Sequence, residues 1–323
     1  MRSAIAIDIG HGWTKVLTGT GTRMRFPSLI AAAPPTVDLG EWSQSPIVSI
    51  NDQPYVVGEA ARPYATPLWS RSKATDADTL RLLWVAMAQV GATGSVQIAT
   101  GLPLAWFGTQ RQLFRQKLIG CSGTVQLPGA APQVITIESA KILPQAVAGA
   151  IATWSHPVTV PDRSLVIDIG YRTTDFLVVQ RAPRTPIDIA LDGSGTIEQG
   201  MSAVAESVVA QLENQWHLPF PLGEVESVDT LSIRGTPVDL VPLREHARAI
   251  LADRLVQELA LRLKGQWDRM DTMVLLGGGS LALHEELAAR LPSAVQVPVD
   301  PQWANVRGYL GAITEVVDSR REA

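Results

Sequence analysis

Two short stretches of the sequence place an aspartate at the end of an apolar run and a glycine two positions later. Residues 7–15 read IDIGHGWTK and residues 167–175 read IDIGYRTTD, so Asp8 aligns with Asp168 without a gap. A turn built on glycine can present backbone N–H groups to a phosphate, because no side chain blocks close approach. A carboxylate at the strand end can hold a hydrated Mg²⁺ that bridges phosphate oxygens. The repeated stretch therefore predicts two turns that clamp one polyphosphate across a cleft.

Other residues in and near these turns suit the same ligand. Lys15 supplies a positive point charge for a β- or γ-phosphate, and the threonines of the two stretches supply hydroxyl groups. A glycine run at residues 277–279 follows an apolar strand and precedes a predicted helix, which suits a ribose or an α-phosphate. The predicted binding residues are Gly10, His11, Gly12, Trp13, Thr14, Lys15, Gly170, Tyr171, Arg172, Thr173, Thr174, Asp175, Gly277, Gly278, Gly279 and Ser280.

Simpler explanations compete with this interpretation. A single Asp-Ile-Gly hairpin is most often only a turn, and Lys15 taken alone is explained equally well as a solvated lysine at a strand end. His11 and Tyr171 align with each other and are expected to shape or cover their turns. Gln145 follows a proline and opens an alanine-rich segment, so its spacing alone favours an ordinary residue at a helix start. The repetition of the stretch, together with the glycine run, favours nucleotide binding.

Apolar periodicity predicts strands and helices that alternate in two halves, each opened by the same hairpin. The predicted strands cover residues 3–9, 15–18, 96–99, 133–137, 165–169, 175–179 and 273–276. The predicted helices cover residues 79–90, 109–118, 146–154, 199–215, 243–267, 281–291 and 304–317. The Pro- and Ser-rich stretch at about 27–75 predicts a small variable subdomain, and residues 155–163 predict a connector. This pattern indicates a two-domain α/β protein with an internal duplication.

Length and composition restrict the class of protein. The chain has 323 residues, of which 46% are hydrophobic, and this is enough for about two domains of roughly 100–200 residues each. The formal net charge of −4 gives no overall basic field, so we expect no direct binding to nucleic acid. A single cysteine, Cys121, excludes an intrachain disulfide, and the five histidines lack metal-ligand spacing. No apolar run approaches the roughly 20 residues of a membrane helix, so we expect a cytoplasmic protein without a membrane partner.

The ordered set of motifs resembles that of the actin/Hsp70/sugar-kinase ATPase superfamily. Within it, the chain is similar to the bacterial and archaeal actin-like proteins typified by the ParM/StbA plasmid-segregation ATPases. The motifs that carry the resemblance are, in order, AIDIGHGWTKV, FPSLI, YVVGEAA, TGLPL, PQAVAGA, VIDIGYRTTDF, LLGGGS and WANVRGY. They span nearly the whole chain. The resemblance implies an actin-like (ribonuclease H-like) α/β fold, duplicated in two domains, with the nucleotide in the interdomain cleft.

The resemblance also implies roles for individual residues. Asp8 and Asp168 would lie around Mg²⁺, with water between, and residues 277–279 would form an adenosine loop. Gln145 would orient the attacking water, which overrides its explanation as an ordinary helix residue; ParM proteins often carry Glu there, and actins carry Gln. The implied catalytic residues are therefore Asp8, Gln145 and Asp168, and the implied cofactors are ATP, with GTP as an alternative, and Mg²⁺.

By the same resemblance, the first domain would comprise residues 1–154 with 301–323, and the second residues 155–300. The implied function is that of an ATPase whose head-to-tail homopolymer assembles with ATP and is weakened by hydrolysis. A DNA-binding adaptor protein at a centromere-like site would couple the filament to plasmid DNA. Two alternatives stay open: a non-polymerising small-molecule kinase, for which Gln145 is a poor general base, and a regulatory ATPase of the same superfamily.

Overall fold

The computed structural model describes residues 3–35, 46–65, 68, 70–154, 161–181 and 187–319. Parts of the predicted subdomain at 27–75 and of the predicted connector at 155–163 lie outside the described residues. The chain forms two compact units, the first of residues 1–153 with 303–323 and the second of residues 154–302. Among the described residues, no helix is long and apolar enough to cross a membrane.

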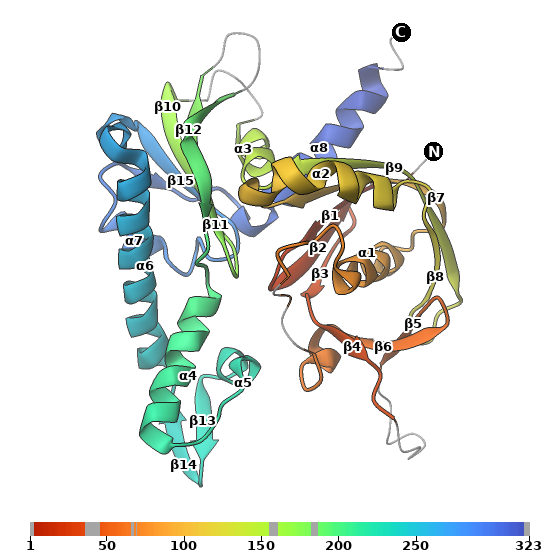
Figure 1. Ribbon diagram of the computed structural model, residues 1–323, viewed down its shortest axis with the longest axis horizontal. Helices are drawn as coiled ribbons and strands as arrows, with labels where there is room; N and C mark the ends of the chain where they lie inside the picture. Colours follow the sequence, from red (N-terminus) through yellow and green to blue (C-terminus); the bar gives the residue numbers. More distant parts are fainter. Residues whose placement is uncertain are drawn as a thin grey trace. The chain divides into compact units, whose positions relative to one another are not determined.

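A mixed sheet forms the core of the first unit. Among the described residues it has nine strands in the order β3-β2-β1-β7-β9-β8-β5-β6-β4. Their bounds are β1 Ser3–Ile9, β2 Trp13–Thr18, β3 Arg23–Pro27, β4 Ile30–Ala32, β5 Ile47–Ile50, β6 Gln53–Val57, β7 Gly94–Leu102, β8 Ser122–Gln126 and β9 Gln133–Pro144. The sheet curves around helix α1 (Ala77–Gln89) (Figure 1). The helix contacts strands near both ends of the sheet, including β2 near one end and β4 at the other. A short 3₁₀ turn covers Gly58–Ala61.

Three further helices cover the first unit's sheet. Helix α2 (Leu104–Leu118) packs on β9 and β7, while α3 (Val147–Thr153) and α8 (Ala304–Ser319) pack on each other. Helix α8 also contacts β1, β2 and β7, so a segment from the far end of the chain completes this unit (Figure 1).

The second unit repeats the hairpin on a smaller scale. Its main sheet, in the described residues, has the order β12-β11-β10-β15-β16, and a separate two-stranded sheet pairs β13 with β14. The strand bounds are β10 Arg163–Ile169, β11 Thr174–Gln180, β12 Asp188–Ile197, β13 Thr230–Ile233, β14 Thr236–Asp239, β15 Thr272–Leu276 and β16 Val295–Gln296. The helix bounds are α4 Ser202–Trp216, α5 Leu222–Ser227, α6 Val241–Leu263 and α7 His284–Ala288, with 3₁₀ turns at Lys264–Arg269 and Pro301–Trp303.

The duplication predicted from the sequence is visible in the strand registers. In the first unit β1 pairs antiparallel with β2 and parallel with β7, and in the second β10 pairs antiparallel with β11 and parallel with β15. Asp8 lies opposite Lys15 in the first hairpin, and Asp168 lies opposite Asp175 in the second. Aligned residues of the two stretches therefore occupy equivalent positions in the two sheets.

Local sequence explains the boundaries of the long helices. Helix α1 begins after Asp76, whose carboxylate accepts a hydrogen bond from Thr79 N at 2.7 Å and so caps the first turn. In α6 the leucines at 251, 255, 259 and 263 recur every four residues, and all four are buried against the second unit's core. That helix ends at Leu263, four residues before the predicted end.

Two predictions from periodicity need correction, and one long strand was missed. The helix predicted for residues 281–291 is reduced to α7, and turns fill residues 278–283, where Leu281 is 67% exposed. The glycine run therefore does not lie at a helix N-terminus. The strand predicted for 133–137 extends to Pro144 through a bulge next to residue 138, so Gln145 follows a long central strand. The long strand β12 was missed because its sequence, DIALDGSGTI, contains two glycines and little alternation.

Candidate functional site

The turn between β1 and β2 is a tight loop that depends on Gly10. Gly10 N donates to Trp13 O at 3.1 Å, and a Cβ atom at Gly10 would lie only 2.9 Å from that same oxygen. Real Cβ atoms do not approach a backbone oxygen so closely, so a side chain here would force the loop open. Ser28 N donates to Gly12 O at 2.9 Å, which ties the loop to the segment after β3.

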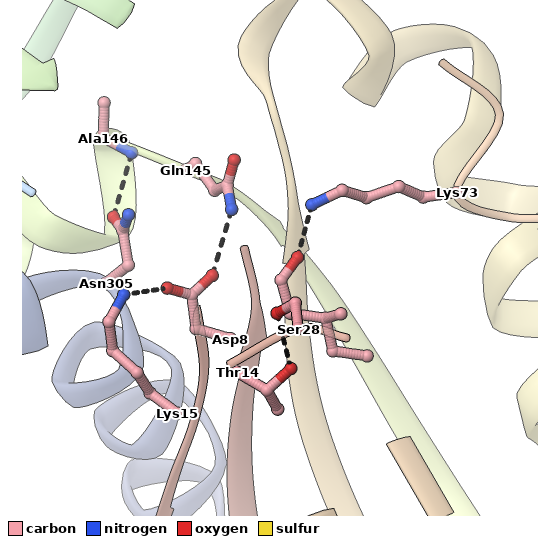
Figure 2. Close-up of polar contacts among 9 residues, drawn as sticks. Asp8, Thr14, Lys15, Ser28, Lys73, Gln145, Ala146 and Asn305 are labelled. Atoms are coloured by element: carbon pink, nitrogen blue, oxygen red, sulfur yellow. Dashed lines mark hydrogen bonds and ion pairs between the residues drawn. The ribbon is translucent and has the colours of Figure 1, made fainter. Parts of the chain in front are cut away.

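Asp8 is the central side chain of the first unit's site. Its residue is buried at the end of β1, and the carboxylate accepts from Lys15 Nζ at 3.1 Å and from Gln145 Nε2 at 3.0 Å (Figure 2). Lys15 reaches it because the two residues face each other across the hairpin, on the same side of the sheet. The structure thus brings together three of the residues predicted from sequence, with the carboxylate compensated by a lysine.

Gln145 lies where β9 ends, beside the end of β7. Its backbone N donates to Leu102 O at 2.8 Å, and α3 begins only at Val147. Ala146, between them, has a positive φ of 60° and donates its N–H to Asn305 Oδ1 at 3.0 Å (Figure 2). Gln145 is therefore not an ordinary first residue of a helix; it is held at a turn that aims its side chain at Asp8.

Sequence reasoning missed two side chains that support this loop. Ser28 Oγ lies 2.8 Å from Thr14 Oγ1 in the interior, and the buried Lys73 donates from Nζ to Ile9 O at 2.5 Å (Figure 2). Ser28 sits in the FPSLI motif, which signalled only a resemblance. Nothing in the sequence around Lys73 distinguishes it from a surface lysine.

The remaining side chains of the first loop lie at its borders. The His11 ring meets Trp106 edge to face, with 5.9 Å between ring centres. Trp13 is 42% exposed, and the Arg25 guanidinium stacks over its ring at 5.1 Å. The Thr14 hydroxyl faces inward, toward Ser28, and its predicted contact with the nucleotide stays a prediction.

The turn between β10 and β11 repeats this backbone geometry. Gly170 N donates to Thr173 O at 2.9 Å, and a Cβ at Gly170 would lie 2.8 Å from that oxygen. Thr174 Oγ1 donates to Gln199 O at 2.8 Å, so this hydroxyl also faces its own unit. Thr173 lies in the turn, where its carbonyl oxygen accepts the Gly170 N–H.

The start of α4 closes over the second turn. Met201 N donates to Gly170 O at 3.1 Å, and Ser202 N donates to Tyr171 O at 2.7 Å. A Cβ at Gly200 would lie 2.6 Å from Gly170 O, so the two segments meet at backbone distance. The Tyr171 hydroxyl donates to Glu226 Oε1 at 2.7 Å. This support from residues 200–202 was not anticipated, although the sequence predicted a helix beginning nearby.

Two aspartates lie opposite each other behind the second turn. Asp168 and Asp175 are both buried and are directly opposed across the hairpin. Thr196, their neighbour on β12, donates from Oγ1 to Asp175 Oδ1 at 2.5 Å. The residue opposite the first-strand aspartate is therefore a lysine in the first unit and an aspartate in the second.

The glycine run packs against the same turn. Gly277 has a φ of +83°, and a Cβ there would lie 2.4 Å from both Asp168 Oδ1 and Ile169 O. Gly279 N donates to Ile169 O at 2.9 Å, and Ser280 Oγ donates to Gly277 O at 2.8 Å. Gly278 faces open space. The second unit thus gathers Asp168, its glycine turn and the glycine run in one place.

Two models of known protein families match the sequence of this chain. Residues 6–147 match the family model of the N-terminal domain of actin-like proteins, and residues 166–289 match that of the C-terminal domain of the archaeal MreB-like actin homologue. The chain belongs to the actin-like proteins. Its two-domain α/β fold, with the hairpin repeated in each half, is the actin-like fold predicted from its motifs.

Individual relatives cover nearly the full chain of this actin-like protein. An archaeal actin homologue of Thermoplasma acidophilum is 26% identical over 95% of this chain and 98% of its own. The crystal structure of an archaeal actin homologue in complex with ADP matches with a TM-score of 0.80 at 22% identity, covering 97% of this chain and 99% of that one. A 15-stranded ParM filament from Clostridium botulinum matches with a TM-score of 0.82 at 20% identity, with the same coverage.

Proposed function

We propose that this actin-like protein binds ATP with Mg²⁺, hydrolyses it, and assembles head to tail into filaments in the cytoplasm. The observation that carries the proposal is the repeated glycine turn, which places a buried aspartate at the end of the first hairpin strand in each unit. The archaeal homologue solved with ADP supports the nucleotide, and the ParM filament supports self-assembly.

The side chains fit a nucleoside triphosphate and a hydrated cation. Lys15 supplies a positive charge, and glycine at positions 10 and 170 leaves both turns without a side chain there. Among the described residues, no group of three or more His, Cys, Asp or Glu side chains is placed to hold a metal ion. Two aspartates with water and phosphate oxygens suit Mg²⁺, which keeps several waters when bound.

In this proposal Gln145 acts on water. Its Nε2 donates to Asp8, which leaves the amide oxygen to accept a hydrogen bond from a water molecule and orient it for in-line attack. A carboxamide cannot remove the proton, so Gln145 positions the nucleophile without acting as a base. The chemistry that Mg²⁺ supplies, when bound, is neutralisation of charge on the phosphate oxygens. Lys15 adds a fixed positive charge beside Asp8.

The wider role proposed for the filament rests on the resemblance to the ParM/StbA plasmid-segregation ATPases. We propose that a DNA-binding adaptor protein couples it to plasmid DNA at a centromere-like site, and that GTP is the alternative nucleotide. The same-fold small-molecule kinase is disfavoured because Gln145 occupies the place of a general base. A non-polymerising regulatory ATPase is separated from our proposal by polymerisation itself.

Sedimentation tests the proposal. Purified protein is centrifuged at high speed with Mg-ATP, with Mg-ADP and without nucleotide, and the pellets are inspected by negative-stain microscopy. We expect filaments with Mg-ATP and fewer with Mg-ADP. The variant Gln145→Ala should still bind ATP but release phosphate slowly, while Gln112→Ala, on the exposed face of α2, serves as control. Phosphate release without any polymer at high protein concentration would favour the regulatory ATPase.

A further inference from the structure

The turn that carries Gln145 is strained. Ala146 is fully buried and has a φ of 60°, a conformation that L-residues other than glycine adopt rarely. Val147 N donates to Gln145 O at 2.6 Å, which closes a three-residue turn around Ala146. Turns of this kind with positive φ are rare and unfavourable, and they persist only where the surroundings hold them.

One side chain supplies a bond that favours this conformation. Asn305, in the first turn of α8, accepts the Ala146 N–H with its Oδ1 at 3.0 Å, and the contact is buried (Figure 2). Ala146 lies 159 residues away in the sequence, so the contact joins two distant segments of the first unit. A buried N–H without an acceptor costs free energy. The bond to Asn305 therefore favours the left-handed conformation, in which the Ala146 N–H has an acceptor.

Helix α8 holds Asn305 rigidly. A Cβ at Gly308 would lie 2.0 Å from Ala148 O, so the backbones of α8 and α3 are in direct contact. A Cβ at Gly101 would lie 1.8 Å from Tyr309 Oη, so α8 also packs tightly on β7. The acceptor oxygen is therefore presented from a helix fixed on two sides.

These contacts determine the direction of the Gln145 side chain. Its own N–H is bound to Leu102 O at 2.8 Å, the next N–H is bound to Asn305, and its Nε2 reaches Asp8 at 3.0 Å. We propose that Asn305 is a positioning residue for nucleotide hydrolysis, which acts by holding Ala146 left-handed so that Gln145 points at Asp8. The inference rests on the role proposed for Gln145. Without Asn305 the peptide bond between residues 145 and 146 can rotate away from this conformation. The Gln145 side-chain amide then no longer points at Asp8.

Single-turnover hydrolysis of Mg-ATP, measured beside ATP affinity, tests this inference. We expect Asn305→Ala to slow hydrolysis about tenfold, the effect of losing one buried hydrogen bond, with nearly unchanged affinity. Adding Ala146→Gly should restore most of the rate, because glycine adopts positive φ without strain. Thr314→Ala, which removes a hydroxyl bond to Leu310 O elsewhere on α8, should leave the rate unchanged.

The outcomes separate the inference from the proposed function. A wild-type rate in Asn305→Ala, beside a slow Gln145→Ala, would overturn the positioning role. So would a slow Asn305→Ala that glycine at 146 does not restore, since that pattern indicates general loss of structure. Equal rates in the wild type and Gln145→Ala would instead remove the function proposed for Gln145. In that case the exchange rate of the Ala146 amide hydrogen, measured without nucleotide, still decides whether Asn305 holds the turn: exchange unaltered in Asn305→Ala would contradict it.

Discussion

The two hairpin turns have the same backbone geometry, and they differ in the charge of the residue opposite the aspartate. In both, the glycine N–H binds the carbonyl three residues later, at 3.1 Å in the first unit and 2.9 Å in the second. Behind the first turn Asp8 is bound to Lys15, whereas behind the second Asp168 faces Asp175. Like charges directly opposite each other across a hairpin are unfavourable. The backbone of the turn is thus repeated in both units, and the residue opposite the aspartate differs between them.

The largest effect should come from neutralising the Asp168 carboxylate in the second unit. We expect Asp168→Asn to reduce Mg-ATP hydrolysis by about 100- to 1,000-fold, the scale seen when one preorganised electrostatic group is lost. Phosphate release under single-turnover conditions measures it over a range of Mg²⁺ concentrations. Recovery of the wild-type rate at high Mg²⁺ would agree with a weakened cation site. An unchanged rate at every concentration would show that Asp168 has no part in the reaction.

The shared backbone predicts equal sensitivity to side chains at the two glycines. Gly10→Ala and Gly170→Ala each place a Cβ within 3 Å of a backbone oxygen, at 2.9 and 2.8 Å. We expect each change to lower the free energy of unfolding by about 2–3 kcal/mol, as other overpacking substitutions do. Chemical denaturation measures both, with Gly108→Ala, which faces open space, as the matched control. A large loss at only one glycine would break the equivalence of the turns.

The residue opposite each aspartate predicts unequal responses to the same substitution. Without divalent cations, Asp8→Asn should destabilise the protein by about 2 kcal/mol, because Lys15 loses its charged partner. Asp168→Asn should destabilise the protein less than Asp8→Asn does, since the residue opposite Asp168 is an aspartate and not a lysine. Thermal denaturation in chelator compares the two variants. Equal destabilisation by both variants would mean that the opposing residue does not determine the response.

The smallest effects should come from the inward-facing threonines. Thr14→Val and Thr174→Val each remove a hydroxyl that is bound within its own unit, to Ser28 and to Gln199 O. We expect about 1 kcal/mol of destabilisation from each, with ATP affinity changed by less than about threefold. Calorimetric titration with ATP gives the affinity. A tenfold loss of ATP affinity in either variant would indicate that the threonine contacts the nucleotide.

Sequence reasoning succeeded where a local pattern repeats. The bounds of β1 agree with the prediction, and both hairpins and the apolar face of α6 lie where periodicity placed them. Periodicity failed after Gly277, because the left-handed glycine and the Ser280 hydroxyl bond produce turns from residues whose apolar spacing is also typical of a helix.

The supports of the site could not be predicted from local sequence. Lys73, Ser28 and Asn305 act through atoms of residues that are 64, 14 and 159 positions away. Asn305 stands in the WANVRGY motif, which signalled only a resemblance, and its use depends on how α8 packs beside α3. Such contacts are fixed by tertiary packing, which neither propensity nor spacing records.

Titration calorimetry of ATP into the wild-type protein, with and without Mg²⁺, tests most directly whether two duplicated turns serve one nucleotide. We predict one ATP bound per chain, with affinity that rises with Mg²⁺ and falls in Asp168→Asn. Two sites per chain, each abolished by alanine at its own glycine turn, would contradict a shared site. Absence of binding under all conditions would contradict the nucleotide itself.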